Sequence, residues 1–487
     1  MLFNSLNFLV FLFIVVSIFY LLPHRYRWVW LLFSSFYFYT SWDTGPILIL
    51  LLVTLVSYVC ALGIRFGGGK SRIVLVLGIV TNLGVLLTFK YFDFFIEQLA
   101  NQLRIFELTD YVSLPRLNLP LPIGLSFYTF STISYLVDVF RGQTEAERHL
   151  GKFAVYVAFF PKLFAGPIER AQTFLPQLRS RIQFDHQMVT EGLQLILWGL
   201  FKKVVIADRL GGFVDAAYKS PAYSSSFDLM IATYFFAFQL YCDFSAYTDI
   251  ARGAAKLFGF NLMENFVRPY FSKSTTEFWG KRWHYSLATW FRDYMYIPMG
   301  GSRVHRLRHY FNLMAVFVVS GFWHAGLGFG VNWSFMAWGA LNGFYQWVAV
   351  STAPLWGKLG MIFPHAKDNR FLSAVRIVFT FHLITFAWIF FRANSLPDAF
   401  LIISRIYNQI GNLPFLIQSY GYTSELIISF ALIGFLLVVE IFDERTSVWQ
   451  RLRTKPVFIR WGVYYVLIIS LIVLGKWGSA QFVYMQF

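Results

Sequence analysis

The sequence contains few charged residues for its length and almost no cysteine. Of its 487 residues, 14% are charged and 57% are hydrophobic, whereas soluble globular proteins average about 25% and about 45–50%. This composition indicates an integral membrane protein. The two cysteines, Cys60 and Cys242, both lie in apolar runs. Their number excludes a disulfide framework and their spacing offers no metal site, so we expect both to be small buried residues.

Several common catalytic motifs are also missing. The sequence has no G-x-S-x-G element for a serine nucleophile, no H-E-x-x-H, no paired C-x-x-C, and no G-x-G-x-x-G after a strand. The run 67–71 resembles part of a phosphate-binding loop, but Ile64 occupies the position of the required first glycine. These absences remove the usual evidence for a hydrolase, a metalloprotease or a dinucleotide-binding protein, and we expect no metal.

Long apolar runs occupy most of the chain. Each is close to the ~17–25 residues that cross a bilayer, or short enough to re-enter it from one side. The runs cover residues 6–22, 28–40, 46–64, 73–89, 124–140, 152–165, 190–206, 228–248, 312–322, 331–350, 371–391, 424–442 and 461–476. The polar stretches between them are too short or too aromatic to bury a core of their own. We therefore predict an all-α polytopic membrane protein, with roughly 10–13 membrane segments in a single domain over residues 1–487.

Basic loops set the predicted orientation in the membrane. Loops 23–28 and 65–72 carry several Lys and Arg residues, whereas the loop 41–45 between them carries none. Because basic loops stay on the cytoplasmic side, the amino terminus is predicted to be external. Loops 353–370 and 444–460 are also basic, which places the carboxyl terminus outside. Since these loop cations attract lipid headgroups, they explain the net charge of +16 without a nucleic-acid partner.

A basic, tryptophan-rich stretch lies in the polar region 261–311. Its aromatic residues recur at roughly helical spacing, with Lys281 and Arg282 off that stripe. The spacing predicts an amphipathic helix on the cytoplasmic side. Two interpretations stay open on these residues alone. The stripe and cations serve packing and headgroup contacts, or they bind an anionic cofactor beside His284.

Two histidines lie inside apolar segments, and one of them is a candidate catalytic residue. His324 follows Trp323 and precedes glycines 326, 328 and 330, where backbones can approach closely and form a narrow cavity. An ionisable side chain in a membrane span is costly and is functional by default, and a neutral imidazole accepts a proton near pH 7. His382 is also in an apolar run, but it has no charged neighbour, and we expect a structural hydrogen bond there. Six others lie in polar or basic loops: His24, His149, His186, His305, His309 and His365.

Ordered blocks of sequence carry a family resemblance over most of the chain. They are residues 1–8, 160–170, 241–253, 261–270, 277–301, 321–324 and 388–393. With these blocks the chain resembles the membrane-bound O-acyltransferase family, in its bacterial alginate O-acetyltransferase-like branch. The resemblance implies a ring of tilted helices around a central tunnel in the bacterial inner membrane. It also implies that an acyl donor enters from the cytoplasm and the acceptor from outside.

The resemblance assigns roles to individual residues. His324 matches the catalytic histidine of the family and His284 its second histidine. We expect His324 to take the proton from an acceptor hydroxyl as that oxygen attacks an acyl thioester, a role worth about 10²–10⁴ in rate, while His284 orients or polarises. The residues expected to hold the donor acetyl-CoA are Lys281, Arg282, Trp290 and Arg292.

The chain departs from the family pattern near this site. Ala325 follows His324 where family members often have glycine, and Asn342 replaces a histidine in a Trp-Gly-x-x-His-Gly pattern. These differences bear on the identity of the acceptor more than on the type of reaction.

Acidic residues lie in or beside apolar sequence as well. An unpaired carboxylate in a membrane span costs about 2.5–3.5 kcal/mol, so Asp243 and Asp249 must be paired, neutral or wet. Asp249 is predicted to pair with Arg252 or else to shape the tunnel mouth, and Asp293, beside Arg292, has the same two possibilities.

Other acceptor polymers, and protein classes other than an enzyme, are also compatible with the sequence. The resemblance favours acetylation of an exopolysaccharide such as alginate, directly or through a periplasmic acetyltransferase partner. Acetylation of peptidoglycan or cellulose and D-alanyl transfer to teichoic acid come next. A polysaccharide transporter would also have many spans, but it would show paired halves, and none are visible between residues 1–243 and 244–487. A non-catalytic scaffold is the remaining alternative.

Overall fold

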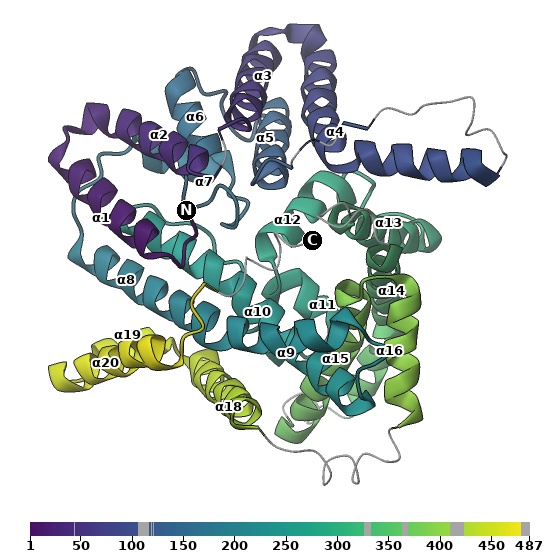
Figure 1. Ribbon diagram of the computed structural model, residues 1–487. Coiled ribbons are helices and arrows are strands. Elements are labelled where there is room, and N and C mark those ends of the chain that lie inside the picture. The colour runs from purple at the N-terminus through teal and green to yellow at the C-terminus, as the bar shows by residue number, and fades with distance from the viewer. Residues whose placement is uncertain are drawn as a thin grey trace. The chain divides into compact units, whose positions relative to one another are not determined.

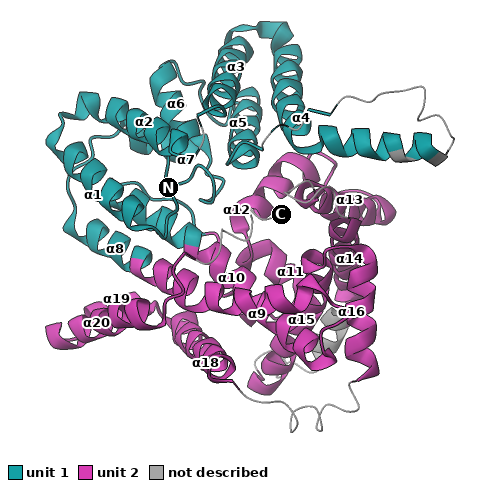
Figure 2. Ribbon diagram, in the orientation of Figure 1, with its two compact units in different colours: residues 1–196, 247–264 teal, residues 197–246, 265–487 magenta. Residues whose placement is uncertain are grey.

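A computed structural model describes residues 1–42, 44–105, 116–117, 119, 121–325, 333–362, 369–409 and 423–478. Within these residues the secondary structure is helical and contains no strand. The chain divides into two compact units, residues 1–196 with 247–264 and residues 197–246 with 265–487 (Figure 2). The all-α fold predicted from the apolar runs is confirmed.

The first unit is built mainly from the amino-terminal helices (Figure 1). They are α1 (Leu6–Leu21), α2 (His24–Thr40), α3 (Ile47–Phe66), η1 (Gly68–Lys70), α4 (Ser71–Ile105), α5 (Leu125–Phe140), α6 (Leu150–Ala158), α7 (Ala171–Arg179) and most of α8 (His186–Leu200). The end of α10 (Ser226–Leu257) also belongs to this unit. Its core is strongly aromatic, with Phe3, Phe8, Phe38 and Phe160 among the fully buried rings.

The second unit holds the π-helix η3 (Phe201–Ala207), most of α10, and everything after residue 264. Its further helices are α9 (Asp208–Lys219), η4 (Pro269–Phe271), α11 (Thr275–Glu277), η5 (Phe278–Arg282), α12 (Tyr285–Phe291), η6 (Arg292–Tyr296), α13 (Arg306–His324), α14 (Trp333–Ile362), α15 (Arg370–Arg392), α16 (Leu396–Asn408), α18 (Ser424–Arg445), α19 (Val448–Arg453) and α20 (Val457–Leu474). Both candidate catalytic histidines therefore lie in one unit.

Six helices of the described chain are long and apolar enough to cross a membrane. They are α3, the segment Gly68–Arg104 that contains α4, α10, α15, α18 and α20, and α1 is a shorter apolar helix. Burial separates two kinds of span. The apolar window of α10 is 89% buried inside the protein, whereas that of α20 is only 11% buried. Because an apolar surface left outside the core needs lipid to cover it, α20 is suited to the bilayer and α10 to the interior.

Glycines bring α13 and α14 into backbone contact. A Cβ atom placed on Gly321 would lie 2.5 Å from the carbonyl oxygen of Phe335, and one on Gly339 would lie 2.5 Å from that of Phe317. Small residues at such a crossing let two membrane helices approach closely. Since Gly321 is one helical turn before His324, this contact fixes the end of α13 against α14.

Replacing Gly339 by alanine should destabilise the protein. The added methyl group has no space, and overpacking of this kind typically costs about 1–3 kcal/mol. We expect a lower Tm for Gly339→Ala, measured by thermal unfolding in detergent. Gly434→Ala in α18 is the matched control because a Cβ there meets nothing within 4 Å, and it should leave the Tm unchanged or slightly raised. Equal Tm values for the two variants would contradict the close packing.

Candidate active site

His324 ends α13 in a pocket of aromatic rings. Its side chain is 2% exposed, and the rings of Trp338 and Phe391 both lie edge-on to it at 5.3 Å between centroids. Trp323 lies at 4.5 Å and Phe335 at 6.4 Å. Such a wall keeps water from the imidazole, and electrostatic interactions strengthen where water is excluded. The glycines 326, 328 and 330, predicted to let backbones approach closely and form a narrow cavity, lie outside the described residues.

Asn342 connects this wall to the tryptophan-rich stretch. Its buried side chain donates from Nδ2 to the carbonyl oxygen of Trp338 at 2.9 Å, and its Oδ1 accepts from Nε1 of Trp279 at 2.9 Å. The rings of Trp279 and Trp338 are 5.5 Å apart. The residue that departs from the family pattern therefore holds the indole of Trp279, whose ring packs against Trp338, the tryptophan that faces His324.

His284 is held by a buried asparagine. Oδ1 of Asn265 accepts hydrogen bonds from the backbone nitrogen and hydroxyl of Ser286, at 3.1 and 3.0 Å. The same oxygen lies 3.1 Å from Nδ1 of His284. A backbone N–H can only donate, so the contacting atom of Asn265 must be its carbonyl oxygen, and Nδ1 of His284 must carry a proton. In the neutral ring Nε2 is then the acceptor. Burial lowers the pKa of His284 to about 3, which keeps the ring neutral near pH 7.

The backbone at His284 breaks the helix that the aromatic spacing predicted. His284 has φ 44° and ψ 53°, a left-handed conformation that is uncommon outside glycine. The backbone nitrogen of Tyr285 donates to the oxygen of Asn265, and that of Val267 to the oxygen of Arg282, both at 2.9 Å. These bonds pair residues 265–267 with 282–285. The prediction of one continuous amphipathic helix is therefore wrong, because tertiary pairing overrides the local pattern at this position.

Aromatic contacts lead from one histidine to the other within the second unit. Trp283, next to His284, packs against Trp388 at 5.0 Å, and Trp388 stacks on Trp338 at 5.9 Å with 13° between the planes. Trp338 in turn faces His324. His284 itself lies 4.7 Å from the ring of Phe244. The structure thus links both histidines, forty residues apart in sequence, through one aromatic cluster.

The residues predicted to hold the donor occupy different settings. Lys281 is exposed. Arg292 is half-exposed and pairs with its neighbour Asp293 at 2.8 Å. Trp290 is buried against Phe291 and Tyr294.

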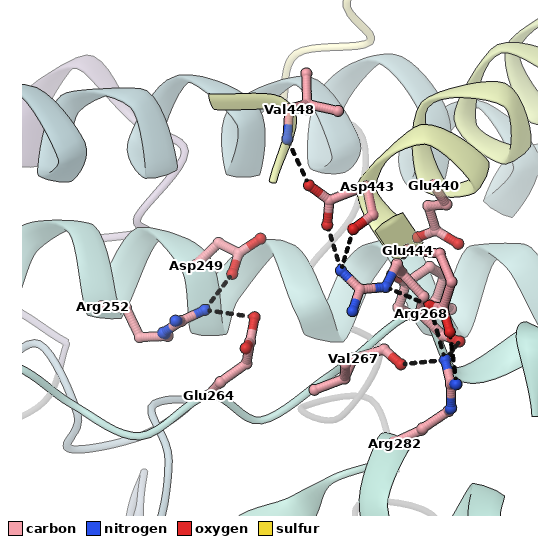
Figure 3. A network of polar contacts seen from close by, with 11 residues as sticks. Asp249, Arg252, Glu264, Val267, Arg268, Arg282, Glu440, Asp443, Glu444 and Val448 are labelled. Carbon is pink, nitrogen blue, oxygen red and sulfur yellow. Dashed lines mark hydrogen bonds and ion pairs between the residues drawn. The ribbon is translucent and has the colours of Figure 1, made fainter. Parts of the chain in front are cut away.

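Arg282 belongs to an ion-pair network with the end of α18 (Figure 3). Its guanidinium contacts Glu277 and Glu444, both at 2.7 Å. Arg268 contacts Glu444 at 2.7 Å and also Asp443. The network joins the stretch before His284 to a membrane helix. Arg282 would therefore have to exchange carboxylates for phosphates in order to bind the donor.

Asp243 and Asp249, both in α10, form ion pairs. Oδ1 of Asp249 lies 3.3 Å from Nη1 of Arg252, which confirms the predicted link (Figure 3). Asp243 is 1% exposed and lies 2.7 Å from Nζ of Lys203, which lies at the same distance from Asp208. Sequence reasoning missed this lysine. Two adjacent lysines at positions 202–203 inside the predicted run 190–206 were an available signal, because an ionisable group in a membrane span marks a site.

His382 behaves as its sequence surroundings predicted. Its Nδ1 donates to the carbonyl oxygen of Val378, one turn earlier in α15, at 2.7 Å. This local hydrogen bond satisfies the ring within its own helix and confirms a structural role for that nitrogen.

Comparison with known proteins identifies the family. Residues 124–393, more than half of the chain, match the model of the membrane-bound O-acyltransferase family. The chain belongs to this family. It is 37% identical over 413 residues to the probable alginate O-acetylase AlgI of Pseudomonas aeruginosa, an alignment that covers 84% of this chain and 75% of the relative. It is also 32% identical over 406 residues to the peptidoglycan O-acetyltransferase of Helicobacter pylori, covering 77% and 72%.

A more distant relative transfers a different acyl group. The chain is 27% identical over 289 residues to the teichoic acid D-alanyltransferase of Streptococcus thermophilus, an alignment that covers 55% of this chain and 68% of the relative. Together with the apolar helices, these matches make this family member a multi-pass membrane O-acyltransferase.

Replacing Asn265, whose carbonyl oxygen accepts the hydrogen bond from His284, should lower the Tm of the protein. Asn265→Ala leaves the buried donors of His284 and Ser286 without their shared oxygen, and each lost partner typically costs about 1–3 kcal/mol. We expect a clear drop in Tm, measured by intrinsic fluorescence. Asn408→Ala is the control, because that exposed asparagine makes a single 3.4 Å contact to Ser404. A wild-type Tm for Asn265→Ala would argue against the hydrogen-bond assignment.

A double-mutant cycle should detect the Arg282–Glu444 pair. The two side chains are 13% and 36% exposed, so we expect a coupling energy near the upper end of the ~0.2–1 kcal/mol measured for exposed pairs, or somewhat above it. The variants are Arg282→Gln, Glu444→Gln and both together, compared by their free energies of unfolding in urea. The pair Arg65–Glu145, at 3.5 Å with Glu145 81% exposed, should show almost no coupling. If both cycles give zero, the network is not stabilising.

Proposed function

We propose that this O-acyltransferase moves an acetyl group from cytoplasmic acetyl-CoA to a hydroxyl of an extracytoplasmic polysaccharide such as alginate. Transfer is direct or passes through a periplasmic acetyltransferase partner. The protein acts in the bacterial inner membrane with both termini external. The names of the alginate and peptidoglycan O-acetylating relatives support an acetyl group and a polysaccharide acceptor, and the basic loops support the orientation.

The buried, ring-enclosed imidazole of His324 is the observation that carries the mechanism. The acceptor hydroxyl gives its proton to His324 while its oxygen attacks the thioester carbonyl carbon. The carbon–sulfur bond breaks, and the leaving thiolate recovers the proton from the imidazolium. The products are an acetyl ester and free coenzyme A. A dry aromatic wall favours this sequence because water, the competing acceptor, is kept from the thioester.

His284 acts as an orienting group in the same proposal. Its Nδ1 proton is committed to Asn265, so Nε2 is the atom that accepts. A neutral ring with a fixed tautomer can receive a hydrogen bond from a hydroxyl without becoming charged. The low pKa of His284 makes it a poor proton acceptor, which leaves the base role to His324.

The donor's phosphates are assigned to Lys281 and Arg292, with Trp290 beside the nucleotide. Both cations are accessible on the predicted cytoplasmic side, and cations at such positions attract anionic groups. Arg282 takes part by positioning the stretch that carries Lys281, or by exchanging its carboxylate partners for a phosphate. Trp323, Asn342, Asp243, Asp249 and Asp293 support the site through the contacts described above.

D-alanyl transfer to teichoic acid is the second candidate. Its support is the match to the D-alanyltransferase, which covers 55% of the chain, whereas the match to the alginate O-acetylase covers 84%. The wider and closer match favours acetyl transfer.

The catalytic assignment predicts that His324→Ala stops turnover without unfolding the protein. Purified wild-type protein with radiolabelled acetyl-CoA and an acceptor oligosaccharide should release coenzyme A and yield labelled product. His324→Ala should be slower by about 10²–10⁴-fold, the usual contribution of a general base. His382→Ala, which removes a histidine from the candidate span α15, is the matched control and should keep nearly full activity. A His324→Ala variant that is active and has a normal Tm would contradict the assignment of His324 as the general base.

The donor is tested separately. Replacing acetyl-CoA by a D-alanyl-loaded carrier protein should give no labelled product if the proposal is right. Product from the carrier protein alone would support the second candidate.

A further inference from the structure

The first unit contains a cavity of about 230 Å³. None of its lining residues is among those assigned above to acyl transfer. The cavity lies where the turn between α1 and α2 meets the start of α6 and the end of α7. It is lined by Phe19, His24, Arg25, Arg27, Trp28, Leu31, His149, Lys152, Leu178, Ile182 and Phe260.

The wall of this cavity is basic on one part and apolar on the other. Two arginines, one lysine and two histidines line it, and no carboxylate is among the lining residues. The remaining side chains are aliphatic or aromatic. Cations without a lining counter-charge favour an anionic ligand, and the apolar remainder favours a ligand that also has a hydrocarbon part.

The cations that line the cavity differ in whether their hydrogen-bond donors already have protein partners. Arg27 builds the wall, since Nε donates to the oxygen of Leu22 at 3.0 Å and Nη1 to the oxygen of Ile182 at 2.7 Å. Arg25 and Lys152, by contrast, form no ion pair with any carboxylate of the described chain. Arg25 is exposed and Lys152 is partly buried. These two side chains therefore have donors to offer to a ligand.

The two histidines that line the cavity lie at the starts of helices, where their ring nitrogens can contact a ligand. His149 caps α6, and its Nδ1 accepts from the backbone nitrogen of Lys152 at 3.3 Å, so the proton of the neutral ring is on Nε2. His24 opens α2, and its Nδ1 is buried without a hydrogen-bond partner in the described structure. A buried polar atom of this kind is rare unless a ligand or water satisfies it. Two helix amino termini add partial positive charge at the same place.

The surroundings of the cavity expose apolar side chains. On the same two helices Leu21 is 83% exposed, Tyr26 48% and Val29 45%, which leaves an apolar surface beside the basic pocket. A soluble phosphate would gain nothing from this surface, whereas an acyl chain would cover it. The loop 23–28 is also the basic loop predicted to be cytoplasmic.

We propose that this cavity binds the phosphate headgroup of an anionic phospholipid from the cytoplasmic leaflet. Arg25 and Lys152 contact the phosphate, His24 and His149 supply further hydrogen bonds, and the acyl chains lie along the exposed sides of α1 and α2. The binding site is independent of the acyl-transfer reaction, so its test does not depend on turnover.

The test measures lipid retention by the full-length protein. Native mass spectrometry of the detergent-purified protein with added phosphatidylglycerol or phosphatidylcholine counts bound lipids. The variant Arg25→Gln/Lys152→Gln removes two cations, each worth about 1 kcal/mol near an anionic membrane surface, so phosphatidylglycerol affinity should fall roughly thirtyfold. The control Lys70→Gln/Arg72→Gln makes the same charge change at two exposed residues of another basic loop and should bind like wild type.

Three results would overturn the proposal. Equal loss in both double variants would show general charge attraction rather than a site. Equal retention of phosphatidylcholine and phosphatidylglycerol by wild type would show that the net negative charge of the headgroup is not recognised. A third result is that millimolar inorganic phosphate displaces the lipid and that phosphate binding is itself weakened by Arg25→Gln/Lys152→Gln. This result would assign the cavity to a soluble anion. A normal Tm for both double variants shows that folding is intact in these comparisons.

Discussion

The backbone contact between α13 and α14 is the constraint on which the active-site geometry depends. Gly321 and Gly339 allow these helices to touch without intervening side chains, and His324 ends the first helix one turn later. Trp338 and Phe335, from the second helix, then face the imidazole. In a bilayer the hydrophobic effect does little to bring helices together, so close packing and small residues must do so. The aromatic enclosure of His324 follows from that contact.

A second requirement is that several buried polar groups around the site share one partner. Asn265 supplies one oxygen to three donors, Asn342 bridges two tryptophans, and Lys203 lies between two aspartates. In each case a single side chain contacts at least one group in a segment other than its own. Removing one partner from such a group leaves the others buried without compensation, so these residues hold together the segments that surround the site. The chemistry of the second unit is thus supported by a small number of shared acceptors and donors.

Composition was sufficient to predict the fold class, and residue type singled out the histidine at the end of α13 as a candidate site residue. The 57% hydrophobic content fixed the environment, and an imidazole in an apolar run is costly enough to be informative by itself. The link between Asp249 and Arg252 was also predictable because residues three apart on a helix are neighbours. The break at His284 was not, since it depends on pairing with residues twenty positions earlier. Asn265 was missed for the same reason, because its partners are distant in sequence, whereas Lys203 was missed although two lysines inside an apolar run had marked it.

The left-handed backbone at His284 has a consequence for how this position can vary. Histidine, asparagine and aspartate enter that conformation more readily than other residues with a Cβ, and β-branched residues hardly do so. A change to alanine therefore alters two things together, the ring and the local backbone energy, and its effect cannot be assigned to chemistry alone. His284→Asn removes the imidazole, and asparagine adopts the left-handed conformation at little energetic cost. Among natural sequences, the same restriction narrows the residues that can occupy this corner even where the ring itself is no longer needed.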